Sequence, residues 1–229
     1  MNTRFLFALT LGTSCFLTQQ GISQQGQVIN AQTFLAEHDG TSFVYDKDGR
    51  ISRVYGKSFS HGNTAVESAD TFVEEWLGIW NCNVSDLIPV GPWGEGQHLQ
   101  PIMFDHETQD YRFYGVGYTQ TFAGIPVYDS RISVLVRNEA NFPAVHITAD
   151  LHDLSNWSLP AGKPSKQKVI SSISERLDSA TSISEPELFV YAGTTGRLTT
   201  PHLAYVSEAI AGSKVDGTFE KWLYIVDAM

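Results

Sequence analysis

The sequence predicts an α+β protein of two units, each an antiparallel sheet packed against a helix. Three observations lead to this prediction. Short runs of alternating apolar and polar residues recur along the chain, two segments repeat apolar residues with helical spacing, and neighbouring runs are joined by short connections. Parallel strands need longer crossovers, so short connections favour antiparallel pairing. With 229 residues, 42% of them hydrophobic and 17% charged, the chain can form one large or two small domains.

The first residues have the composition of a secretory signal peptide. A single basic residue, Arg4, precedes an apolar run that is too short to span a membrane as a helix. Small residues near Ser23 suggest a cleavage site, so we expect residues 1–23 to be removed and the protein to be secreted or periplasmic, with no membrane span. Cys15 leaves a lipid-anchor signal as an alternative. If residues 1–23 are removed, Cys82 is the only cysteine left and no internal disulfide can form.

A hairpin is expected after an N-terminal stretch whose element type, helix or strand at residues 33–37, stays open. Strand-like runs flank the turn sequence Asp46-Lys47-Asp48-Gly49 within residues 43–55. The Asp-x-Asp-Gly spacing also occurs in calcium loops, but the later ligands and the closing Glu of an EF-hand are missing. The sequence therefore favours a hairpin.

A helix should follow over residues 64–80. Thr64 and Glu67 have the spacing of a capping box. Behind them, apolar residues repeat at three and four, which gives the helix one apolar face for packing on a sheet: Val66, Ala69, Phe72, Val73, Trp76, Leu77 and Trp80. Residues 81–110 are rich in Gly and Pro, and this composition predicts a long irregular connection.

The centre of the chain is a second hairpin, which should set the register of the sheet. Alternating runs over residues 112–122 and 128–136 meet at Ala123-Gly124-Ile125-Pro126. Gly124 can take a positive φ, and Pro126 fixes its own φ and donates no hydrogen bond. We therefore expect a turn, with Pro126 at a strand start or a bulge.

The remaining elements complete both units. A third strand over residues 144–149 belongs to the first unit, and residues 159–164 have the composition of a linker. A helix can begin at Ser165, because Val169, Ile170, Ile173 and Leu177 have helical spacing. Three strand-like runs separated by Gly-containing turns then form a meander: residues 187–192, 202–210 and 219–226.

The central hairpin resembles a segment in the proregions of thermolysin-like and fungalysin-like secreted zinc metallopeptidases. The pattern Q-T-x-x-G-I-P-V-x-G-x-x-x-x-V is matched at Gln120, Thr121, Gly124, Ile125, Pro126, Val127 and Val134 or Val136. Two positions depart from it, because Ala123 stands where Asn is frequent and Asp129 stands where Gly usually follows. Residues 201–206 and 221–228 resemble the L-A-Y-x-V and W-x-Y-x-V-D-A strands that close the same proregions.

This resemblance, from about residue 40 to the end, implies an FTP-like propeptide domain at residues 24–158 and a PepSY-like domain at residues 159–229. It implies a non-catalytic chaperone and inhibitor of a zinc metallopeptidase whose catalytic domain is absent from this chain and which is bound in cis or in trans. In relatives, the end of the proregion leads toward the cleavage region. We therefore expect the last residues to contact the partner's cleft: Tyr224, Ile225, Val226, Asp227, Ala228 and Met229.

The sequence offers little sign of catalysis of its own. It contains no H-E-x-x-H, and the nearest string, His106 to Asp110, ends in Asp. We expect no catalytic residue, metal ligand or cofactor. Cys82 could be a thiolate that blocks a metal site, but it lacks basic neighbours, which favours a structural role. The net charge of −10 argues against nucleic-acid binding. The alternatives are a stand-alone secreted binding module using Trp93 and Trp157, a trans-acting peptidase inhibitor, and an enzyme with an unrecognised carboxylate site.

Overall fold

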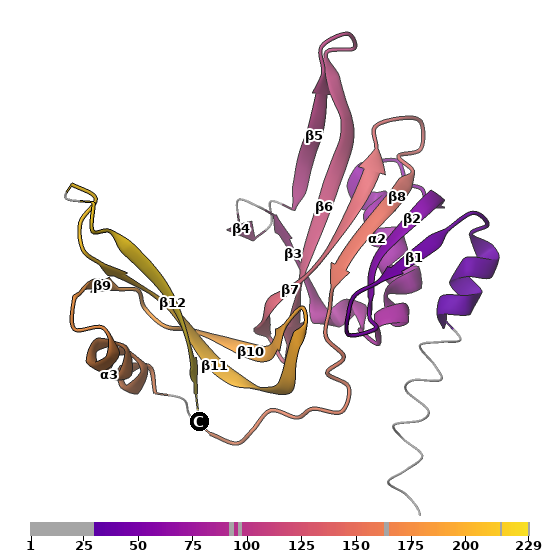
Figure 1. The fold of residues 1–229 in the computed structure, drawn as a ribbon. Coiled ribbons are helices and arrows are strands. Elements are labelled where there is room, and N and C mark those ends of the chain that lie inside the picture. The colour runs from indigo at the N-terminus through magenta and orange to yellow at the C-terminus, as the bar shows by residue number, and fades with distance from the viewer. Residues whose placement is uncertain (1–29, 92–93, 96–97, 163–164, 216, 229) are drawn as a thin grey trace, which may run out of the picture.

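The computed structural model describes residues 30–228 apart from 92–93, 96–97, 163–164 and 216, and it confirms the α+β class (Figure 1). The strands are β1 (Ser42–Tyr45), β2 (Ile51–Ser60), β3 (Leu87–Gly91), β4 (Gly94–Glu95), β5 (Leu99–Asp105), β6 (Asp110–Phe122), β7 (Ile125–Arg137), β8 (Ala144–Asp150), β9 (Ala180–Ile183), β10 (Glu187–Thr194), β11 (Arg197–Ala211) and β12 (Glu220–Asp227). The helices are α2 (Ala65–Trp76) and α3 (Lys166–Arg176), with 3-10 turns at Leu77–Trp80 and Val84–Asp86 and helical residues at 30–37. The expected signal peptide, Trp93 and Met229 lie outside the described residues.

The strands form one continuous mixed sheet rather than two. The order across it is β1-β2-β8-β7-β10-β11-β12, and β6 pairs with β7 while carrying β3 and β5 on its other side. Strands β7 and β10 run parallel and meet at the pair Val127 and Val190, whereas the other neighbours are antiparallel. Two separate antiparallel sheets are therefore not confirmed, because β7 contributes to both parts. We call residues 30–158 the first half and residues 159–228 the second half.

The core of the first half lies between α2 and the sheet. Phe72 and Val73 from α2 are buried together with Val116, Val134 and Ile147 from β6, β7 and β8. In β7 and β8, the buried Val134 and Ile147 lie between exposed or half-buried neighbours, as the period-two pattern predicts. The helical residues at 30–37, whose type the sequence leaves open, also join this core through a buried phenylalanine, Phe34.

The start of α2 follows the prediction in part. Thr64 is the N-cap, and its hydroxyl oxygen accepts from the Glu67 N–H at 3.1 Å. The Glu67 carboxylate accepts from the Asn63 N–H at 2.9 Å, one residue before the position that a capping box specifies. The backbone N–H groups of Asn63 and Glu67, on either side of Thr64, thus both have hydrogen-bond partners.

The predicted helix is too long at its end. The α-helix stops at Trp76, and Leu77–Trp80 tighten into a 3-10 turn. Trp80 is buried there, and its indole N–H donates to the Ile51 carbonyl oxygen at 2.7 Å. This bond gives the buried indole nitrogen a partner in β2, so Trp80 is a core residue.

The prediction of an irregular connection over residues 81–110 is wrong, since the segment contains β3, β4 and β5. Strands β3 and β5 share the outer edge of the long strand β6. Pro89 pairs with Tyr118, and Pro101 pairs with Tyr114. Both prolines lie on outer strands, where a missing N–H costs little, so a high proline content is compatible with strands here.

A glycine explains how closely β3 approaches β6. A Cβ built on Gly117 would lie 2.7 Å from the carbonyl oxygen of Val90. No side chain larger than hydrogen fits in that space without a backbone shift. Gly117 of β6 therefore allows the close approach of the β3 backbone, a contact that the sequence pattern did not indicate.

The second half follows its predicted order, with one strand added. Ser165 is the N-cap of α3, and Val169 and Ile173 pack against Tyr205 and Ala209 of β11. Strands β10, β11 and β12 match the three expected runs. The short strand β9, which no pattern indicated, pairs with the far end of β11 beside β10.

The turn between β6 and β7 consists of Ala123 and Gly124. Their φ angles are 50° and 80°, so both residues are in the left-handed region, as a type I′ hairpin turn requires. Asp129, two residues after Val127, also has a positive φ of 54°. The two departures from the proregion pattern thus fall at positions where the backbone favours the pattern's Asn and Gly.

Ala123→Asn should stabilise the protein by about 0.5–1 kcal/mol, because Asn adopts the left-handed region at lower cost than Ala. The free energy of unfolding in urea measures this change. Gly124→Ala is the matched control: it adds a Cβ with nothing within 4 Å, yet it should destabilise through φ alone. A lower stability for Ala123→Asn would contradict this interpretation of the turn.

Candidate functional site

The residues of the proregion pattern lie where β7 passes from the first half toward the second. Thr119 of β6 pairs with Arg131, but Thr121 pairs with Pro126. Residues 127–130 therefore bulge out opposite the single residue Gln120. Pro126 is at the start of β7, as predicted, and the bulge follows it.

Gln120 is buried, with 2% of its surface exposed, and holds this bulge. Its Oε1 accepts from the Ser130 hydroxyl at 2.7 Å and from the His152 N–H at 2.9 Å. Its Nε2 donates to the His152 carbonyl oxygen at 2.7 Å. A side-chain amide supplies acceptor and donor together, so one residue joins the bulge of β7 to the backbone after β8.

Cys82 lies beside this amide. The Gln120 Nε2 donates toward its sulfur at 3.4 Å. Burial, with smaller contributions from the carboxylates of Asp86 and Asp153, raises the pKa of the Cys82 thiol to about 12. The thiol is therefore protonated at neutral pH, which fits the structural role and not a metal-blocking thiolate.

An apolar cluster joins the two halves next to the bulge. Val127 and Leu154 of the first half are buried against Val190, Ala192 and Leu203 of the second. Partly buried residues complete this junction cluster: Phe122, Ile125, Trp157, Leu188 and Ala228. Of the predicted site residues, the structure thus brings Ile125, Val127 and Ala228 into one cluster.

Trp157, a contact residue in the binding-module alternative, is partly buried in the junction cluster. Its ring lies 4.8 Å from that of Phe122, centre to centre, within the junction cluster. Because aromatic pairs at this distance contribute to packing, the residue is explained as part of the core between the halves.

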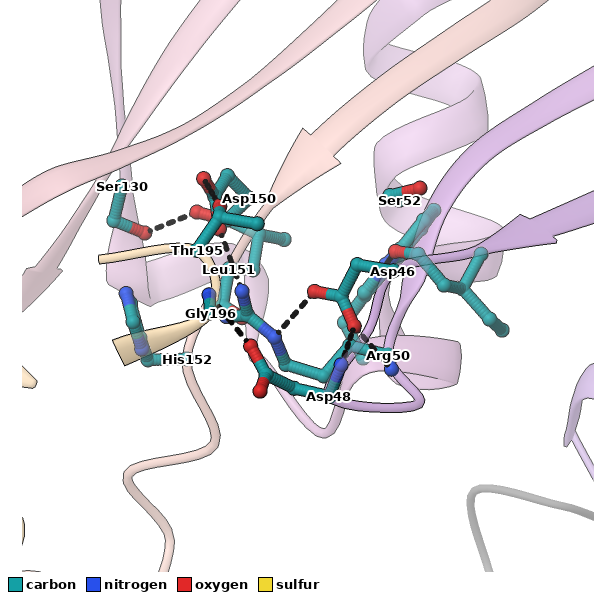
Figure 2. A network of polar contacts seen from close by, with 12 residues as sticks. Asp46, Asp48, Arg50, Ser52, Ser130, Asp150, Leu151, His152, Thr195 and Gly196 are labelled. Carbon is teal, nitrogen blue, oxygen red and sulfur yellow. Dashed lines mark hydrogen bonds and ion pairs between the residues drawn. The ribbon is translucent and has the colours of Figure 1, made fainter. Parts of the chain in front are cut away.

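A polar network also joins the two halves, as Figure 2 shows. Within the first half, Arg50 Nε donates to Asp46 Oδ2 at 2.9 Å. Its Nη2 donates to Asp150 Oδ1 at 3.0 Å, and its Nη1 donates to the Leu151 carbonyl oxygen at 3.1 Å. Arg50 thus ties the β1–β2 turn to the end of β8.

The β10–β11 turn of the second half docks onto this arrangement. The Thr195 hydroxyl donates to Asp150 Oδ2 at 2.6 Å, and the Gly196 N–H donates to Asp48 Oδ2 at 2.7 Å. Asp150 therefore bridges Arg50 and Thr195. We call these residues the polar junction: Asp46, Asp48, Arg50, Asp150, Thr195 and Gly196.

Asp46 should make the stability of the polar junction depend on pH. Burial alone raises the pKa of Asp46, but the N–H groups of Arg50 and Asp48 and the guanidinium charge outweigh burial and hold the pKa below its usual value. The unfolded chain then binds this proton more tightly than the folded chain does. The stabilisation is present above the unfolded pKa and is lost as the pH falls through the folded pKa.

We expect the stability difference between the native chain and Asp46→Asn to be constant from neutral pH to about pH 5 and to shrink below about pH 4. Urea unfolding at a series of pH values gives this difference. A difference that does not change with pH would show that the Asp46 charge contributes nothing to folding.

The C-terminal strand β12 carries the remaining predicted contact residues. Tyr224 and Val226 face α3 and pack in its core, whereas Ile225 is 38% exposed and Asp227 is exposed. Gly124, which belongs to the proregion pattern, lies in the exposed turn between β6 and β7. The structure does not gather all predicted residues into one surface, since only Ala228, the residue after β12, packs in the junction cluster among Tyr224 to Ala228.

The described residues show no arrangement for metal chemistry. In the described ranges, no group of three His, Cys, Asp or Glu side chains is placed to hold a metal ion. His106 and Glu107 lie in the exposed β5–β6 turn. No helix in the described part of the chain is long and apolar enough to cross a membrane.

No protein-family model matches the sequence, and no curated protein matches it at a significant level. One similar solved structure is the C-terminal domain of YpeB from Bacillus megaterium, with 13% identity over 91% of this chain and 98% of that one, and a TM-score of 0.36. The likeness is distant, and the function proposed below rests on this chain's own residues.

The sequence does not indicate the polar junction. Arg50 and Asp150 are separated by 100 positions, and Asp48 and Gly196 by 148. No periodicity links such distant residues. The available signals were local: the Asp46 to Gly49 turn and the Gly-rich turn at residues 193–196, each recognised as a turn and neither as a contact surface.

Proposed function

We propose that this chain is a secreted proregion-like module, FTP-like over residues 24–158 and PepSY-like over residues 159–229. It would act as a chaperone and inhibitor of a zinc metallopeptidase, in cis or in trans. The observation that carries the proposal is that residues of the proregion pattern have identifiable structural roles in this chain. Gln120 holds the β7 bulge, and Gly124 forms the left-handed turn.

The two positions that depart from the pattern also support a hairpin and bulge shared with the proregions. The positions where the proregions favour Asn and Gly, here Ala123 and Asp129, both have positive φ. If the proregions share this hairpin and bulge, their sequences should favour Asn and Gly at the positions with positive φ. The proposal extends this shared local structure to a shared role.

The expected contact segment, Tyr224 to Met229, begins within the edge strand β12 (Glu220–Asp227). Exposed apolar side chains on this strand give a peptidase a surface to cover, including Trp222 at 49% and Leu223 at 52% exposure. Such exposed apolar groups at a strand edge are suited to a protein partner. The contact would depend on surface complementarity.

The test is inhibition of thermolysin and of a fungalysin-type peptidase by the purified chain, together with the refolding yield of each enzyme in its presence. We expect saturable inhibition or a raised yield with at least one enzyme. Absence of both effects with both enzymes would overturn the proposed function.

Ile225→Ser tests the contact segment, with Val44→Ser as matched control. Both residues are 38% exposed and lie on outer strands at opposite ends of the sheet. Ile225→Ser should weaken inhibition about tenfold, which corresponds to about 1.4 kcal/mol of lost contact, and Val44→Ser should leave it unchanged. Equal inhibition by both variants would remove the segment from the contact.

A further inference from the structure

Strand β12 is an open, regular edge of the sheet. Among the described residues it pairs with β11 alone, and its register with β11 is unbroken from Glu220 to Asp227. The opposite edge, β1, is only four residues long and its register shifts between Val44 and Tyr45. Short strands and bulges protect edges from pairing with other chains, and β12 has neither.

The hydrogen-bonding direction of β12 follows from two contacts. The Ala228 N–H donates to the Leu203 carbonyl oxygen at 3.0 Å, so every second residue back along β12 also faces β11. On β11, Glu208 instead bonds to Ser184, away from β12, as this alternation requires. The backbone groups of Leu223 and Ile225 therefore point to the open side.

We propose that β12 pairs with β12 of a second copy of this chain, antiparallel about a two-fold axis at Tyr224. In this register Leu223 faces Ile225 of the second copy, and their outward N–H and C=O groups exchange hydrogen bonds. The two-fold axis repeats this pair on the other side of Tyr224. The two sheets would then be continuous across the dimer.

The strand's own sequence selects this register. Besides the Leu223 and Ile225 pair, it places the Lys221 ammonium opposite the Asp227 carboxylate of the second copy and Trp222 opposite Val226. A shift of two residues in one direction puts Lys221 opposite Ile225. A shift in the other puts Leu223 opposite Asp227. One register therefore matches apolar with apolar and positive with negative.

Lys221 already lies 2.7 Å from Glu208 of its own chain, so its ion pair across the dimer would contribute to register more than to affinity. The apolar residues carry the interface: 49% of Trp222, 52% of Leu223 and 38% of Ile225 are exposed in the single chain. The inference goes beyond the proposed function, since it concerns the chain without a peptidase. Pairing would also cover the segment expected to contact the peptidase.

Light scattering after size exclusion, over a range of concentrations, measures the association. We expect the mass of two chains at high concentration and of one chain on dilution. Ile225→Lys places a charge opposite Leu223 and should raise the dimer dissociation constant at least about tenfold. Val44→Lys, with the same exposure on β1, should leave the dimer unchanged. A native chain that is monomeric throughout, or an Ile225→Lys chain that dimerises normally, would overturn the proposal.

Cysteine cross-linking tests the register. A mixture of Leu223→Cys and Ile225→Cys chains should form a disulfide-linked dimer on mild oxidation, because paired Cα atoms here would lie about 5.5 Å apart. Either variant alone should cross-link much less, and the unsubstituted chain measures the background from native cysteines. Equal cross-linking in all samples would contradict this register. Both side chains are exposed, so neither substitution should disturb folding, and thermal unfolding of each variant checks this point.

Discussion

Gln120→Leu should lower the free energy of unfolding by about 3–4 kcal/mol. Leucine fills a similar volume but supplies no polar group. The N–H and carbonyl oxygen of His152 lose their amide partner, and the Ser130 hydroxyl keeps only its bond to the Asp150 carbonyl oxygen. Because the site is buried, water cannot replace these bonds without opening the bulge.

Thr121→Val is the matched control for Gln120→Leu. Thr121 is also buried, on the same strand, but its hydroxyl makes one bond, donating to the Asp86 carbonyl oxygen at 3.2 Å. Its loss should cost about 1 kcal/mol. Urea unfolding followed by circular dichroism gives both values. A cost for Gln120→Leu no larger than that of Thr121→Val would refute the role assigned to the amide.

Arg50→Met should destabilise the protein by about 2–3 kcal/mol and loosen the contact between the halves. Methionine keeps an apolar stem but leaves the Asp46 and Asp150 carboxylates without their cation. Their side chains are 8% and 26% exposed, so water compensates only in part. The Gly196 amide, which donates to Asp48, should exchange its hydrogen faster in the variant.

Arg112→Met is the comparison for Arg50→Met, because Arg112 pairs with Asp105 at 2.8 Å while its own side chain is 58% exposed. An exposed pair of this kind should contribute at most about 0.5 kcal/mol. Asp150→Asn in the Arg50→Met background should recover part of the loss by removing an unpaired charge. Equal effects of the two arginine substitutions would show that the polar junction does not stabilise the fold.

Elements specified by local residues could be predicted from the sequence. Both hairpins, the start of α2 at Thr64 and the helix after Ser165 follow from turn, capping and periodicity signals within a few positions. The strands in residues 81–110 could not, because Pro89 and Pro101 indicate interruption unless β6 is known to offer an edge. Tertiary pairing there overrides local preference.

The candidate site could also be predicted only in part from the sequence. The pattern around Gln120 and Gly124 identified where the chain turns, but it gave no reason for the glutamine. That reason is the backbone of His152, which lies 32 positions away. Local signals likewise could not predict that the sheet continues through Val127 and Val190, because this pairing depends on how the two halves meet.

The junction between the halves has a consequence for the integrity of the chain after cleavage. Strand pairing at Val127 and Val190, the junction cluster and the polar junction all join segments from either side of residues 158–159. Ser158 and Leu159 are themselves exposed. A peptidase that cuts there would sever the covalent connection and leave the non-covalent one in place, so the two pieces would remain together as a nicked complex.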